Sequence, residues 1–171
     1  MHVSRRAFLG VAAASLGAGA LAACAAIDPN ATPQENLANV VTDVNDIAGA
    51  FMKVLPQIAA INGVPTSVIA TVTSAVDEMQ VVAQALSKAA LSTTAAQPLV
   101  QKIETDVNAV VDAVASLPLP SSVSSVIQAA SILLPIIEAA VNLSVTTPAV
   151  KASSMSPDEA RAVLRLTRLS H

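Results

Sequence analysis

Two carboxylates, Asp43 and Asp46, are the residues whose type and spacing come closest to a site for chemistry. Three residues apart on a helix, they would lie side by side, as a pair for metal binding or acid–base catalysis does. They flank Val44, which belongs to the apolar face, so we expect both on the solvated side of the helix. Metal sites in helical bundles are built from inward Glu-x-x-His units, and this sequence contains none.

Other catalytic groupings are also missing from the sequence. There is no Gly-rich phosphate loop, no Ser/His/Asp set and no Cys/His pair, and His171 is the only histidine after His2. We therefore expect no enzyme activity, no cofactor and no bound metal.

A basic stripe lies near the end of the chain, at Arg161, Arg165 and Arg168. Residues 156–159 read Ser-Pro-Asp-Glu, which predicts a helix start with a capping box and proline at the first position. The arginine spacing puts all three side chains on one face of this helix. That face could contact an anionic lipid surface or an acidic partner. The alternative is a helix that is solvated or docked on the protein itself.

The only cysteine, Cys24, excludes an internal disulfide or a multi-cysteine zinc site. It follows Leu21, Ala22 and Ala23, and this segment resembles the lipobox of bacterial lipoproteins. The resemblance implies that the chain is cleaved before Cys24, which is diacylated and anchors the protein to a membrane. By the same family tendency, Ala25 implies the outer membrane where the cell has one.

The residues before the lipobox have the anatomy of an export signal. The basic part resembles a twin-arginine translocation signal and departs from it at Gly10, where Lys is common. The matching residues are Ser4, Arg5, Arg6, Phe8 and Leu9. The apolar part, residues 7–20, is broken by glycines and too short to span a bilayer stably. We expect an exported protein held on the periplasmic or extracellular side of a membrane.

The composition is strongly skewed. Of the 171 residues, 53% are hydrophobic, 12% charged and 1% aromatic, and the formal net charge is -3. Nucleic-acid binding needs clustered Lys and Arg with stacking aromatics, so the composition argues against it.

Apolar residues recur at alternating spacings of three and four in four stretches, which predicts helices rather than strands. The first is predicted to start at Pro33 with a Thr32–Glu35 capping box, the second to cover about 66–91, and the third to start from a capping box at Thr94. Pro56 should kink the first helix or end it near Leu55. The first apolar seam comprises Leu37, Val40, Val44, Ile47, Phe51, Val54, Ile58 and Ile61.

Linkers of about three to five residues force consecutive helices to lie antiparallel. The predicted fold is all-α, an up-down-up-down four-helix bundle with a short C-terminal helix. The fourth seam is apolar enough to raise the question of a membrane span, but Gln128, Pro135 and Glu138 favour a buried bundle helix. The expected parts are a signal (1–23), a lipidated tether (24–32), the bundle (33–143), a linker (144–155) and a basic helix (156–171).

A faint internal repeat suggests two duplicated helical hairpins. Thr-Asp-Val-Asn occurs at 42–45 and 105–108, and Leu-Pro at 55–56 and 117–118, with offsets of 63 and 62. Thr-Ser-Val-Ile at 66–69 is matched by Ser-Ser-Val-Ile at 124–127, with an offset of 58. The alternative is chance repetition within a small vocabulary of residue types.

The leading hypothesis is a membrane-anchored helical-bundle lipoprotein, acting as a non-enzymatic interaction or structural component of the cell envelope, with a protein partner there. The alternative is a carrier of an apolar ligand such as a lipid, because small alanine side chains could leave a cavity between the helices.

Overall fold

Five helices make up the described part of the chain, residues 33–88, 93–141 and 155–170 of this computed structural model. In chain order they are α2 (Pro33–Ala59), α3 (Thr66–Lys88), α4 (Thr93–Val114), α5 (Ser121–Ala140) and α6 (Pro157–Leu169). No strand occurs in these ranges. The predicted all-α class is confirmed.

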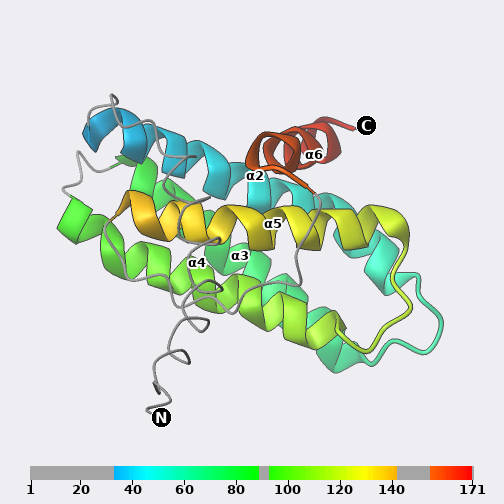
Figure 1. The fold of residues 1–171 in the computed structure, drawn as a ribbon. Helices are drawn as coiled ribbons and strands as arrows, with labels where there is room; N and C mark the ends of the chain where they lie inside the picture. The colour runs from blue at the N-terminus through cyan, green and yellow to red at the C-terminus, as the bar shows by residue number, and fades with distance from the viewer. Residues whose placement is uncertain (1–32, 89–92, 142–154, 171) are drawn as a thin grey trace, which may run out of the picture.

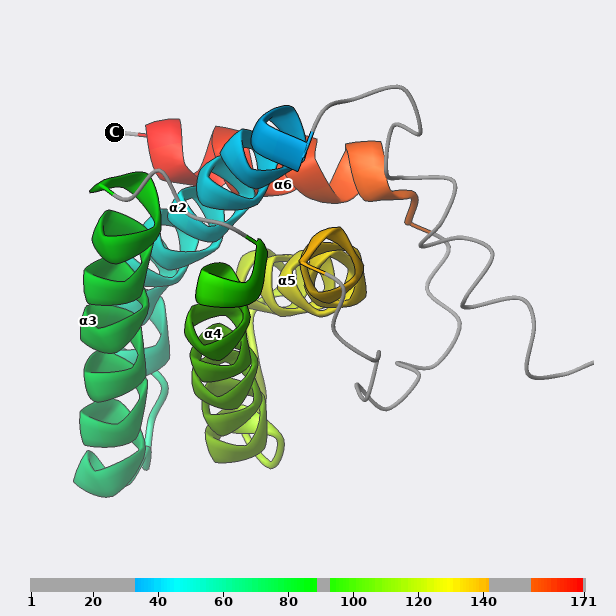
Figure 2. The same ribbon diagram turned by 90° about the vertical axis from the view of Figure 1, so that its left-hand side faces the viewer.

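Helices α2 to α5 form a four-helix bundle in which each helix packs against the next and α5 returns to α2. The short connections make neighbours antiparallel, as the ribbon shows (Figure 1). The last helix, α6, lies outside the bundle, across α2 and α5 (Figure 2). The predicted bundle with an additional C-terminal helix is therefore the observed architecture.

The predicted apolar seams form the core. On α2, Val44, Ile47, Phe51, Val54 and Ile58 are all fully buried. They belong to one cluster, whose other large members include Met79, Leu86, Ile103, Leu133, Leu134 and Ile137. The helical period therefore outweighed the strand propensity of the many Val and Ile residues.

We expected Pro56 to kink the first helix or to end it near Leu55, and the end near Leu55 was wrong. Helix α2 continues through Pro56 and ends at Ala59. Proline removes its own N–H donor and crowds the preceding turn, but Pro56 lies in the last turn of the helix and is exposed. Its carbonyl still accepts from the N–H of Ala60 at 3.0 Å, so the last turn is kept.

The capping box expected at Thr94 was also wrong. Helix α4 already begins at Thr93, which puts Thr94 inside the first turn. The Gln97 side chain, which would have closed that box, donates instead to the carbonyl of Val141 at 3.0 Å. It thereby ties the start of α4 to the end of α5. The box expected at Thr32 lies outside the described residues.

Helix α5 is the one helix in the described ranges that is long and apolar enough to cross a membrane. More than half of it is buried inside the protein, where it packs against α2, α4 and α6. A helix covered on several sides is apolar almost all round without meeting lipid. This placement agrees with the predicted bundle helix.

The two Thr-Asp-Val-Asn segments have the same local structure. Thr42 donates to the Ala38 carbonyl at 3.0 Å and Thr105 to the Gln101 carbonyl at 2.9 Å. The following aspartates are both buried. The Leu-Pro pairs differ, since 55–56 lies within α2 and 117–118 lies beyond the end of α4. The duplication stays a prediction, supported by the first segment and not by the second.

Replacing Phe51 by Ala should lower the free energy of unfolding by about 3–5 kcal/mol, because it deletes the largest fully buried side chain of an aliphatic core. Urea unfolding followed by far-UV circular dichroism measures this loss. The neighbouring Met52→Ala is the control, since Met52 is 49% exposed and should lose far less. Equal losses would show that Phe51 is not a core residue.

Candidate functional site

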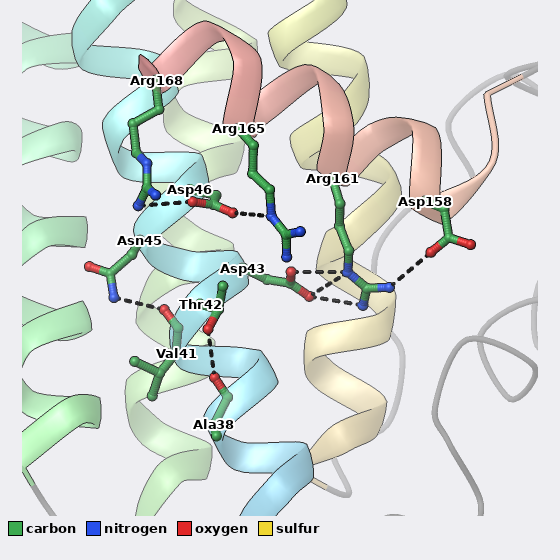
Figure 3. Close-up of polar contacts among 10 residues, drawn as sticks. All are labelled: Ala38, Val41, Thr42, Asp43, Asn45, Asp46, Asp158, Arg161, Arg165 and Arg168. Atoms are coloured by element: carbon green, nitrogen blue, oxygen red, sulfur yellow. Dashed lines mark hydrogen bonds and ion pairs between the residues drawn. The ribbon is translucent and has the colours of Figure 1, made fainter.

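The predicted solvated position of Asp43 and Asp46 was wrong. Asp43 is only 3% exposed and Asp46 only 1% exposed. Helix α6 crosses over α2 and covers both carboxylates with its arginine face (Figure 3). The two sets of residues singled out for chemistry therefore meet each other, although more than a hundred residues separate them in the chain.

Arg161 binds Asp43 through two parallel hydrogen bonds. Its Nε donates to Oδ1 at 3.0 Å and its Nη2 donates to Oδ2 at 3.0 Å. This fork geometry is the strong form of an arginine–carboxylate contact. The hydrogen bonds to Asp43 raise the pKa of Arg161.

Asp46 is shared by two arginines, one on each carboxylate oxygen. Arg165 donates from Nε to Oδ2 at 3.1 Å, and Arg168 places Nη1 2.9 Å from Oδ1. The Asp46 side chain is 1% exposed, whereas those of Arg165 and Arg168 are 53% and 42% exposed. The arginines thus bring a solvated charge down to a carboxylate that water does not reach.

Gly49 makes room for this contact on α2. A Cβ at this position would lie 2.6 Å from Cδ and 2.8 Å from Cγ of Arg168. The absent side chain therefore lets the Arg168 stem lie against the backbone of α2. We call Asp43, Asp46, Gly49 and the three arginines the α6 clamp.

The sequence at the start of α6 explains why this segment is helical. The Ser156 hydroxyl accepts from the backbone N–H of Glu159, and the Glu159 carboxylate accepts from the backbone N–H of Ser156. These hydrogen bonds lower the pKa of Glu159. Pro157 occupies the first helical position, as predicted. Ala160 and Leu164 on the inner face are fully buried and add apolar contact to the clamp.

In this arrangement the arginines and aspartates of the clamp form ion pairs with one another. The three arginines are balanced by Asp43 and Asp46 below them and by Asp158 and Glu159 on α6 itself. Within the described ranges, no group of three or more His, Cys, Asp or Glu side chains is placed to hold a metal ion. The structure thus places Arg161, Arg165 and Arg168 in the self-docked arrangement, in which each arginine is paired with a carboxylate of α2.

Asp106 is a buried carboxylate that sequence reasoning did not single out. It lies on α4, is 6% exposed, and its Oδ2 has no hydrogen-bond partner. Burial raises the pKa of Asp106 to about 6; nearby Lys102 opposes the shift and Glu78 adds to it. Lys102 forms its ion pair with Glu78 on α3. Asp106 is therefore the counterpart of Asp43 in the sequence repeat, without an arginine to neutralise it.

The signal and lipobox residues, including Cys24, lie outside the described residues. Comparison with protein families, with curated proteins and with solved structures found no match to this chain. The site is therefore interpreted from its own geometry.

Gly49→Ala should reveal how tightly α6 is held. In an Arg168→Ala background it should stabilise the protein by about 0.5–1 kcal/mol, because alanine is the better helix former. In the wild-type background the new Cβ displaces Arg168, so the gain should vanish or reverse. Urea unfolding of the four proteins measures the coupling.

The Arg168→Ala background is a fair reference, since the Cβ of residue 168 lies 3.7 Å from the new Cβ, an ordinary contact. An equal gain in both backgrounds would mean that Arg168 does not lie over Gly49.

Asp106→Asn should stabilise the protein near pH 7.5 by about 1–3 kcal/mol, because the amide has no charge to desolvate at this buried position. Because the pKa of Asp106 is raised in the folded state, the wild type loses stability as pH rises from about 4 through 6. The advantage of Asn should therefore shrink at pH 4. Urea unfolding at the two pH values measures it.

Asp112→Asn is the matched control, because Asp112 is exposed on the same helix. A pH-independent difference between Asp106→Asn and the wild type would contradict this account.

Proposed function

We propose that this protein is an exported bacterial lipoprotein, anchored through Cys24, whose helical bundle is a non-enzymatic interaction or structural component of the cell envelope. It sits on the periplasmic or extracellular side of a membrane, the outer membrane where there is one. Its partners are the membrane, through the anchor, and a protein in the envelope.

The observation that carries the interaction role is the way α6 is mounted. Buried ion pairs fix its inner face to α2, while Leu166 and Leu169 on the other side are 71% and 64% exposed. Apolar side chains on a firmly held helix are typical of a surface that meets another molecule.

The placement of the acidic groups supports a non-enzymatic role. Asp43 and Asp46, the pair that could have carried acid–base chemistry, are instead neutralised by the arginines of α6. A carboxylate held in this way serves the fold.

The proposed anchor accounts for residence at a membrane surface. Each buried methylene of an acyl chain contributes about 0.8 kcal/mol, so two or three chains hold a protein stably where one does not. Residues 24–32 reach only about 30 Å when extended, which keeps the bundle close to its membrane.

An apolar-ligand carrier is the weaker alternative. The side chains that would line such a cavity, including Phe51, Met79 and Ile137, pack together with no exposure in the described bundle. We therefore do not propose it.

Cys24→Ser should move the protein from the membrane fraction to the soluble fraction of the envelope, since a hydroxyl at this position cannot be acylated as the thiol is. Fractionation and mass spectrometry of the full chain measure the shift and the lost acyl mass.

Arg5→Lys with Arg6→Lys should leave an unprocessed precursor inside the cell.

The neighbouring Ala25→Ser is the control, because it keeps the thiol and should stay acylated. Membrane residence of Cys24→Ser equal to that of the wild type would overturn the proposed anchor.

A further inference from the structure

A row of four polar side chains runs from α3 to α4. Ser74 and Glu78 are four residues apart on α3, and Lys102 and Asp106 are four residues apart on α4. Residues at this spacing are neighbours on a helix surface. The Ser74 hydroxyl donates to Oε1 of Glu78 at 3.4 Å, and the Lys102 ammonium donates to Oε2 of the same carboxylate. The row is therefore continuous from Ser74 to Asp106.

The two carboxyl groups of this row differ in their access to water. The side chains of Glu78 and Lys102 are each 46% exposed. Asp106 is only 6% exposed, and its Oδ2 has no hydrogen-bond partner. The ammonium of Lys102 thus binds the carboxylate that water also solvates, and the buried carboxyl next to it is left without a cation.

The two carboxyl groups also ionise in different pH ranges. Burial raises the pKa of Asp106 to about 6, whereas the hydrogen bond from Lys102 lowers the pKa of Glu78. Below the pKa of Asp106, Glu78 is ionised and Asp106 is neutral, so Lys102 has one carboxylate to pair with. Above it, Asp106 releases its proton to water, and two carboxylates compete for one ammonium.

Burial decides this competition. A carboxylate at the surface keeps much of its hydration when its ion pair opens, and exposed ion pairs contribute little to stability. A buried carboxylate without a cation is far more costly. Glu78 also keeps the hydroxyl of Ser74. Lys102 therefore gains more from the ionised Asp106 than it loses by leaving Glu78.

We propose that Lys102 is a proton-controlled link between α3 and α4: it pairs with Glu78 across the two helices while Asp106 is protonated, and it turns to Asp106 along α4 when that carboxyl ionises. The exchange replaces a contact between two helices by a contact within one helix. It also leaves Glu78 unpaired, so this face of the bundle gains one negative charge as the pH rises.

The charged groups that act on Asp106 are Lys102 on its own helix and Glu78 on α3. Asp77, next to Glu78, is exposed. On α5 the one charged residue is Glu138, at the end that Gln97 ties to the start of α4, more than two turns from Asp106. The carboxylates Asp43 and Asp46 of α2 are paired with α6, and the other charged residues of α2 and α4 are Glu35, Lys53, Glu104 and Asp112.

The test is nuclear magnetic resonance of the full chain in detergent micelles at pH 5 and pH 7.5. Nuclear Overhauser contacts of the Lys102 Hε protons should run to Glu78 Hγ at pH 5 and to Asp106 Hβ at pH 7.5. In Asp106→Asn the contacts with Glu78 should persist at both pH values, because the amide does not ionise. Asp112→Asn, at an exposed position of the same helix, is the matched control and should show the wild-type exchange.

Titration of the Asp106 carboxyl, followed by its ¹³C chemical shift, tests the competition. Lys102→Gln should raise the midpoint by about one pH unit, because the ionised carboxylate then has no cation. Glu78→Gln should lower it, since Lys102 then has no other carboxylate to pair with. Asp77→Asn removes the same charge one residue away without freeing Lys102, so it should lower the midpoint less.

Contacts between Lys102 and Glu78 that persist in the wild type at pH 7.5 would overturn the exchange. So would an Asp106 midpoint near 4, the ordinary value for aspartate, or equal shifts in Glu78→Gln and Asp77→Asn. Circular dichroism at both pH values checks that every variant keeps its helices. The result does not depend on acylation of Cys24, so the exchange and the proposed anchor fail separately.

Discussion

Two buried carboxylates on one helix impose the main constraint on this fold. Taking Asp43 and Asp46 out of water costs several kcal/mol each unless a cation and hydrogen bonds replace the lost hydration. Little else in the described bundle could do so, because only 12% of the chain is charged and the core is aliphatic. The arginines of α6 do, and losing a buried partner typically costs about 3–5 kcal/mol. The cost is smaller for Arg165 and Arg168, which solvent screens.

The helices and their order could be predicted from the sequence because the apolar period of Val44, Ile47 and Phe51 depends only on neighbouring residues. The burial of Asp43 could not, because it is produced by α6, which lies 118 residues further along the chain. The arginine spacing showed that α6 has a basic face, but not which acidic surface that face meets. Gly49 carried no signal without its neighbour Arg168, whereas the spacing of Leu166 and Leu169 was visible in the sequence and could have indicated an exposed apolar side of α6.

The proposed repeat makes the difference between the two halves of the bundle informative. Asp43 and Asp106 follow threonines with the same backbone hydrogen bond, and both are buried. Helix α6 packs against one helix of each half, α2 and α5, and its Arg161 reaches Asp43 on α2, whereas burial of Asp106 on α4 raises the pKa of that carboxyl. The same residue type in nearly the same local structure is therefore paired with an arginine on α2 and left without a hydrogen bond to one oxygen on α4, because the arginines of α6 reach α2.

The rotation of α6 about its own axis is set by its contacts with α2. Its inner face is specified by charge, since Arg161 and Arg165 find their carboxylates at fixed positions on α2, and this leaves little freedom in how the helix is rotated. The rotation in turn decides which side chains face outward. Leu166 and Leu169 point to solvent because the arginines point to α2. The ion pairs on Asp43 and Asp46 thus act on the outer surface as well as on the core, and a change in either carboxylate would alter which side chains α6 turns to solvent.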